Sequence, residues 1–291
     1  MKYTIHHKTT YHYAAPVHQS YHLLHLSPRV VPTQKVLRHR VTAHPDFKLR
    51  NGLTDYFGNP YSILAIEEDH TELVVDACSE LEVTAEEHGA LSETSGWQQV
   101  ADGGGGANAA MPKDVVQYAI ASRHGPRRRS LAQYAAPSFR VGQPILAGAN
   151  DLMGRIFEDF TFDPSATDVS TPVETVLKNR RGVCQDFAHL MIAAMRSLNL
   201  PARYVSGYIR TIPPEGQPRL QGADASHAWA SVWAPETGWV DFDPTNNVIP
   251  HGDHITIAHG RDYEDVSPIS GVILGGGEHS VDVAVDVIPQ P

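Results

Sequence analysis

A single cysteine stands where a loop of this chain has to become a buried helix. Cys184 comes two residues after Gly182 and is followed by apolar residues at helical spacing, Phe187, Leu190, Met191, Ala194 and Leu198. This spacing predicts a helix of about four turns with one buried face, which Asn199 and Pro201 would end. At a helix start, unpaired N–H groups and the helix dipole favour a thiolate. The position suits a nucleophile, although a small buried cysteine without a chemical role would fit the same pattern.

Two alternating segments further along the chain carry a histidine and two aspartates. Residues 226–233 and 238–245 alternate as strands do, with turn residues between them. If Trp233 lies opposite Trp239, His227 faces Thr245 directly and Asp243 diagonally, within reach of its side chain. Alone, His227 would be interpreted as a hydrogen-bonded core histidine and Asp243 as a turn residue before proline. Together with Cys184 they predict a Cys/His/Asp constellation for nucleophilic catalysis.

Four motifs around these residues resemble the bacterial transglutaminase-like superfamily, whose members are often described as cysteine proteases. The motifs are RGVCQDFAH at 181–189, LPARYVSGY at 200–208, HAW at 227–229 and DPT at 243–245. They occur in the family's order and spacing, and the resemblance covers roughly residues 145 to 270. The N-terminal part resembles, more weakly, the all-β domain that commonly precedes this core.

The resemblance implies an α+β fold and a set of roles. A papain-like or transglutaminase-like core would pack a helix bearing the cysteine on an antiparallel sheet bearing the histidine and aspartate. Cys184 would be the nucleophile, His227 the general base and acid, and Asp243 the residue that holds the imidazole. The backbone N–H of Cys184 is the expected oxyanion donor. The candidate substrate contacts are Tyr208, Trp229 and Asp224.

Composition and turn signals predict the division of the chain. Residues 1–86 hold short alternating runs and are expected to form a β-sandwich-like domain. Residues 87–112, with the glycine run 103–106, are expected to be a linker or a loosely packed excursion. Residues 113–270 would be the catalytic domain. Residues 271–291 end in alternating valines and are expected to form a strand that could return to the N-terminal sheet.

The charge balance and the cysteine count limit the classes of protein. With 33 acidic and 23 basic residues, the chain is not expected to bind nucleic acid or an anionic membrane. Two cysteines leave no disulfide framework, and no apolar signal region opens the sequence. We therefore expect a cytoplasmic protein. His251, His254 and His259 fit no single helical face and no cysteine accompanies them, so no metal or other cofactor is expected.

The function predicted from these features is cysteine-dependent acyl transfer. Hydrolysis of amide or peptide (isopeptide) bonds through a thioester on Cys184 is the preferred form, with a peptide, protein or glutamyl-amide substrate. Transamidation of protein glutamine to an amine acceptor is the alternative. A non-catalytic binding or scaffolding protein with the same fold is the alternative of a different class. The sequence leaves the substrate and the oligomeric state open.

Overall fold

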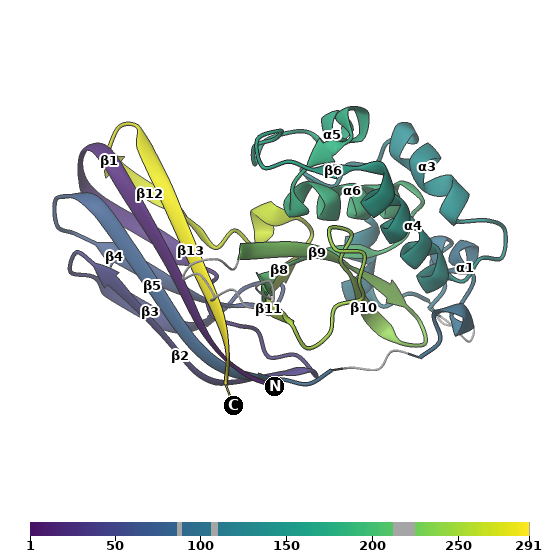
Figure 1. Cartoon of the computed structure of the whole chain (residues 1–291), viewed down its shortest axis with the longest axis horizontal. Helices are drawn as coiled ribbons and strands as arrows, with labels where there is room; N and C mark the ends of the chain where they lie inside the picture. The colour runs from purple at the N-terminus through teal and green to yellow at the C-terminus, as the bar shows by residue number, and fades with distance from the viewer. Residues whose placement is uncertain (86–88, 106–109, 212–224, 291) are drawn as a thin grey trace, which may run out of the picture.

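Two antiparallel sheets organise the chain, one on each side of the molecule (Figure 1). The computed structural model describes residues 1–85, 89–105, 110–211 and 225–290. The helices gather around the smaller sheet, and the larger sheet stands apart from them (Figure 1). The predicted fold class is confirmed as α+β with an antiparallel sheet in the core and a preceding β domain.

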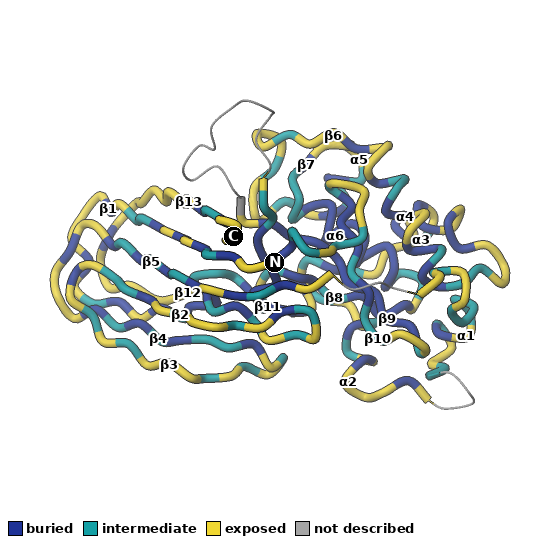
Figure 2. Tube along the Cα trace, turned by 60° about the horizontal axis from the view of Figure 1, so that its bottom comes forward, coloured by how far each residue is buried: buried dark blue, intermediate teal, exposed yellow. Residues whose placement is uncertain are grey.

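The larger sheet has seven strands and is built on one long strand. Its path is β2-β5-β1-β4-β3, and β12 and β13 also pair with β1. The strands are β1 (Lys2–Leu24), β2 (Gln34–His44), β3 (Lys48–Thr54), β4 (Pro60–Ile66), β5 (His70–Val83), β12 (Ile269–Gly275) and β13 (His279–Gln290). Buried and exposed residues alternate along the first part of β1, as the period of a strand requires (Figure 2). The C-terminal segment thus pairs with the N-terminal sheet, while the predicted domain boundaries stay predictions.

The smaller sheet carries His227 and leads directly into Asp243. Its order is β10-β9-β8-β11, all antiparallel. The strands are β8 (Ala202–Ile209), β9 (Ala225–Ala234), β10 (Gly238–Phe242) and β11 (His254–Gly260). Trp239 pairs with Trp233, which is the register that the sequence predicts. Beyond Phe242 the chain leaves this pairing, and Asp243 bridges Val248 instead.

The helices pack on and around this sheet. The α-helices are α1 (Trp97–Ala101), α2 (Lys113–Val116), α3 (Arg129–Ala135), α4 (Ile145–Asp159), α5 (Val173–Asn179) and α6 (Cys184–Ser197). The 3-10 turns are η1 (Leu91–Glu93), η2 (Gln117–Ala119), η3 (Ala136–Ser138) and η4 (Tyr263–Asp265). Two short strands, β6 (Thr161–Phe162) and β7 (Arg181–Gly182), form a parallel pair. α6 contacts β9 and β8 and is buried along most of its length (Figure 2). Among the described residues, no helix combines the length and the apolar character that crossing a bilayer requires.

Residues 87–112 contribute more to the core than the sequence suggested. The described part of this segment holds η1 and α1, and Val100 of α1 is fully buried. Trp97 packs against the same core cluster. The few apolar residues of this segment lie between glycines and show no periodicity. The sequence pattern therefore could not distinguish a packed segment from a linker.

Two side-chain amides join the two sheets. β11 is an edge strand, and an unpaired edge leaves backbone groups without partners. The Gln34 side chain accepts from the backbone N–H of Thr256 at 2.9 Å and donates to its carbonyl at 2.7 Å. Asn59 does the same for His259, at 2.8 and 2.7 Å. Each amide thus takes the place of a neighbouring strand along β11.

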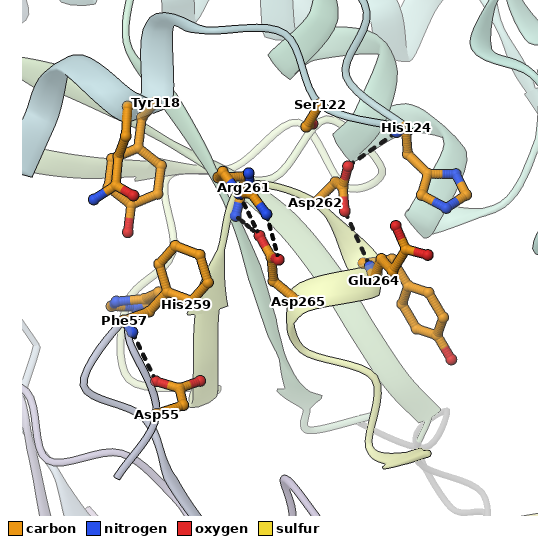
Figure 3. A network of polar contacts seen from close by, with 12 residues as sticks. Asp55, Phe57, Tyr118, Ser122, His124, His259, Arg261, Asp262, Glu264 and Asp265 are labelled. Carbon is orange, nitrogen blue, oxygen red and sulfur yellow. Dashed lines mark hydrogen bonds and ion pairs between the residues drawn. The ribbon is translucent and has the colours of Figure 1, made fainter. Parts of the chain in front are cut away.

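The segment after β11 is fixed by its own carboxylates (Figure 3). Asp262 is buried and accepts from the backbone N–H groups of His124, at 2.9 Å, and Glu264, at 3.0 Å. The Arg261 side chain donates twice to Asp265, at 2.9 Å each. These contacts tie the end of β11 to the loop before α3.

Gly207 on β8 offers a test of how closely the smaller sheet is packed. A Cβ there would clash with the carbonyl of Ile255 and lie 2.5 Å from the Trp229 ring. We expect Gly207→Ala to lower the free energy of unfolding by about 1 to 3 kcal/mol or more, because neither neighbour can give way freely. Gly252→Ala is the control, since nothing lies within 4 Å of the added carbon. Chemical denaturation that shows equal stability for both variants would contradict this packing.

Candidate active site

Cys184 is the first residue of α6 and is half-buried. The chain can turn into the helix here because Gly182, two residues earlier, lacks a side chain: a Cβ at Gly182 would lie 2.6 Å from Oδ2 of Asp186. That carboxylate oxygen accepts from the backbone N–H of Val183 at 2.8 Å and so caps the helix. The thiol therefore sits at the helix start that the sequence predicts.

His227 hydrogen-bonds to Cys184 on one side and to Asp243 on the other. The side chains of Cys184 and His227 are in hydrogen-bonding contact. Nε2 of His227 lies 2.7 Å from Oδ2 of Asp243. His227 comes from β9 and is 7% exposed, whereas Asp243 directly follows β10 and is fully buried. The structure thus brings the three sequence-predicted residues into one hydrogen-bonded chain.

The Asp243 carboxylate is surrounded by donors. Oδ2 is hydrogen-bonded to His227, to Nε2 of His254 at 3.0 Å, and to Nδ2 of Asn246 at 2.7 Å. Oδ1 accepts from the backbone N–H groups of Thr245, at 2.9 Å, and Asn246, at 3.3 Å. Burial alone would raise the pKa of Asp243, but the hydrogen bonds from His227 and His254 hold it well below its usual value. The group therefore stays a carboxylate at any physiological pH.

The same interactions control His227. Burial alone would lower its pKa, but the hydrogen bonds to Asp243 and Cys184 outweigh burial and raise the pKa to about 10. Because this lies above the ordinary value of 6.5, the protonated form stabilises the folded chain. That stabilisation is complete below about pH 6.5 and is lost as the pH rises through about 10.

The sequence pattern did not connect His254 or Asn246 with Asp243. Asn246 follows the turn-forming Asp243 by three residues, which is a recognisable signal for a side chain folded back on a turn. His254 has no such signal, because it reaches Asp243 only through the pairing of β11 with β8. The ligand atoms of His227, Asp243 and His254 lie within 4.8 Å of one another, a spacing that a metal ion could use. Such an ion would have to replace the two hydrogen bonds that join both imidazoles to Asp243.

A cleft of about 440 Å³ opens beside Cys184 and His227. One wall belongs to the part of the chain that carries Cys184 and includes Gln185 and Tyr204. The other wall is a face of the larger sheet, where residues of β1 and β13 lie side by side: His7, Thr9, Tyr11, Val281, Val283 and Val285. The β domain therefore forms half of the space in front of the thiol.

Family models match both parts of the chain. The model of the transglutaminase-like superfamily matches residues 132–244, and that of the bacterial transglutaminase-like N-terminal region matches residues 3–82. An uncharacterized protein of Mycobacterium tuberculosis is 38% identical over 299 residues, which covers 99% of this chain and 93% of that relative. The chain belongs to the transglutaminase-like superfamily.

Two further similarities place this transglutaminase-like chain among its relatives. A crystal structure from Cytophaga hutchinsonii, described as a "Putative Cysteine Protease", superposes with a TM-score of 0.77 at 20% identity, covering 100% of this chain and 92% of that one. It shares the fold. A protein-glutamine gamma-glutamyltransferase of Pseudomonas aeruginosa is 32% identical over 129 residues, which are 44% of this chain but only 19% of that protein.

The structure does not place the predicted substrate contacts of this transglutaminase-like chain in the Cys184 cleft. Tyr208 is 4% exposed, and its hydroxyl is hydrogen-bonded to Nδ1 of His7 at 2.7 Å. Trp229 is fully buried and donates to Oδ2 of Asp241 at 2.8 Å. The adjacent β domain and Asp241 occupy the positions that these two side chains point to. Asp224 lies outside the described residues.

The pKa of His227 tests the hydrogen-bonded chain. In Asp243→Asn we expect it to fall from about 10 toward 6.5 or below, because burial then outweighs the remaining contact with Cys184. Histidine NMR titration measures the change. Asp241→Asn is the matched control, since Asp241 accepts from Trp229 rather than from His227, and it should leave the pKa near 10. A pKa that is unchanged in Asp243→Asn would contradict the pairing.

Proposed function

We propose that this protein is a cysteine-dependent acyl-transfer enzyme that hydrolyses amide or peptide (isopeptide) bonds through a thioester on Cys184. The observation that carries the proposal is the hydrogen-bonded chain from Cys184 through His227 to Asp243, beside a cleft of about 440 Å³. Membership in the transglutaminase-like superfamily supports the same chemistry. Acyl transfer needs a nucleophile, a base within hydrogen-bond reach and a group that orients the base.

The proposed reaction has two steps. Cys184 Sγ attacks the carbonyl carbon as a thiolate paired with the protonated His227, and His227 gives its proton to the leaving amine as the C–N bond breaks. The neutral His227 then takes a proton from the water that attacks the thioester, which releases the acid and restores the thiolate–imidazolium pair. The backbone N–H of Cys184, at the start of α6, is the donor that we assign to the oxyanion.

Asp243 would act by orienting the imidazole. Its bond to Nε2 of His227 leaves Nδ1 as the ring nitrogen that faces the thiol. Because Asp243 itself is held by His254, Asn246 and backbone N–H groups, it cannot turn away from His227 without losing several hydrogen bonds at once. The carboxylate would therefore fix the tautomer and stabilise the imidazolium.

Transamidation is the second candidate, in which an amine rather than water resolves the thioester. The similarity to the Pseudomonas aeruginosa gamma-glutamyltransferase over 129 residues favours it. We place hydrolysis first because water is always present at high concentration and no residue of the motifs marks an amine subsite. A binding or scaffolding role would not require a thiol, an imidazole and a carboxylate in hydrogen-bonding order. A peptide, protein or glutamyl-amide substrate and a cytoplasmic location stay predictions.

Variants of the three residues should rank in a fixed order. We expect Cys184→Ala to abolish covalent turnover, because no other side chain of the motif replaces the thiolate. His227→Ala should cost about 100-fold to 10,000-fold in kcat/KM, since the proton relay is lost. Asp243→Asn should cost less, and Asp241→Asn little. Assays with pooled peptide and glutamyl-amide libraries measure the order, and a folded Asp241→Asn that is more impaired than Asp243→Asn would reverse the carboxylate assignment.

The fate of the thioester separates hydrolysis from transamidation. On a substrate that is turned over, mass spectrometry with and without added primary amine should show the free acid as the main product in both cases. Conversion to the substituted amide as soon as amine is added would favour transamidation instead.

Alkylation of the two cysteines separates an enzyme from a scaffold. Iodoacetamide near neutral pH should label Cys184 much faster than Cys78, because the thiolate reacts and Cys184 lies at a helix start with the imidazole of His227 beside it. Cys78 lies in β5, and burial raises the pKa of its thiol. Peptide mass spectrometry over a time course gives both rates. Equal rates would count against a nucleophilic Cys184.

A further inference from the structure

A second pocket, of about 390 Å³, lies where the larger sheet meets the smaller one. We call it the junction pocket. The larger sheet's side supplies residues 29–33 and the end of β5, and the smaller sheet's side supplies residues of all four of its strands. None of the residues that line it also lines the Cys184 cleft. The proposed catalysis assigns this space no role.

Arg203 brings a positive charge without an ion-pair partner among the described residues to the junction pocket. Its guanidinium stacks on the Trp239 ring, 4.3 Å from the ring centre. Within the described residues, no carboxylate forms an ion pair with Arg203, and its Nε is buried without a hydrogen-bond partner. A mostly buried cation without a partner is costly to the fold. Proteins usually meet that cost with an anion.

A second guanidinium lies close to the first. Arg29 lines the same pocket, and its Nη1 donates to two neutral oxygens, the carbonyl of Phe57 at 2.9 Å and Oδ1 of Asn59 at 2.7 Å. Burial lowers the pKa of Arg203 to about 10, and the charge of Arg29 lowers it in the same direction. Asp241 also lines the pocket and partly offsets this charge, but its Oδ2 already accepts from Trp229. Two cations thus face one engaged carboxylate.

Two buried imidazoles complete the polar lining. His259 is 4% exposed and His254 is 8% exposed, and Nδ1 of each is buried without a hydrogen-bond partner in the described structure. Burial and the charges of Arg203 and Arg29 hold the pKa of His259 well below its ordinary value, so the ring is neutral. A neutral imidazole can still present one N–H to an acceptor. The N–H of the His259 ring has no acceptor among the described residues, whereas His254 already donates its ring N–H to Asp243.

We propose that the junction pocket binds a small oxyanion, a carboxylate or a phosphate group, held by Arg203 with Arg29 and His259 around it. An arginine fork matches both groups in geometry, and a charge-assisted bond is strong where water is excluded. The volume suits a small molecule. This site stands apart from the proposed catalysis, because Cys184 takes no part in it.

Binding of two probes tests the proposal. Inorganic phosphate and benzoate, each titrated at constant ionic strength against sodium chloride, should raise the melting temperature and give saturable isotherms by calorimetry for at least one of them. The probe that binds tells phosphate from carboxylate. Arg203→Gln should weaken that binding at least tenfold, whereas Cys184→Ala should leave it unchanged.

NMR of the wild-type protein decides the matter if Arg203→Gln does not fold. The bound probe should shift the ring signals of His259 and His254, and it should leave those of His7, which lines the Cys184 cleft, unaffected. Saturable binding with these shifts supports the site. If neither probe binds saturably, if Arg203→Gln binds as well as wild type, or if only His7 responds, the proposal is wrong and the pocket holds water alone.

Discussion

A fully buried carboxylate sets the geometry of this protein. A charge without water is tolerated only when hydrogen bonds replace its hydration, and Asp243 needs donors on both oxygens. They come from β9 through His227, from β11 through His254, and from the turn through Asn246 and backbone N–H groups. Moving any one of these segments would leave a lone pair of Asp243 or a histidine ring nitrogen without its hydrogen-bond partner. The arrangement of residues around the Cys184 thiol thus follows from the hydrogen bonds that replace the hydration of the Asp243 carboxylate.

Sequence pattern predicted the parts of the site that depend on local spacing. The stripe after Cys184 indicated α6, and the register that pairs Trp233 with Trp239 placed His227 near Asp243. The superfamily and the fold class are confirmed as well. The sequence pattern could not predict contacts between residues that are far apart in the sequence. His254 reaches Asp243 only after β11 has paired with β8, and no periodicity encodes which strands become neighbours.

The β domain helps to form both the Cys184 cleft and the junction pocket. It provides one wall of the Cys184 cleft and one side of the junction pocket, and two of its amides complete the edge of β11. His254 connects the two spaces, since one ring nitrogen binds Asp243 while the ring lines the junction pocket. The β domain also explains why Tyr208, a predicted substrate contact, instead packs against His7.

The position of β1 between β5 and β13 affects how the chain folds while the ribosome makes it. β1 emerges first, but the strand that covers its second edge, and that supplies the buried Val285 and Val287, emerges only with residues 279–290. At roughly 5 to 20 residues per second, the nascent chain carries that open edge for about 15 to 60 seconds. An exposed strand edge can pair with other chains. Translation speed, and any chaperone that shields β1 meanwhile, should therefore influence the yield of folded protein more than in a chain whose neighbouring strands are made consecutively.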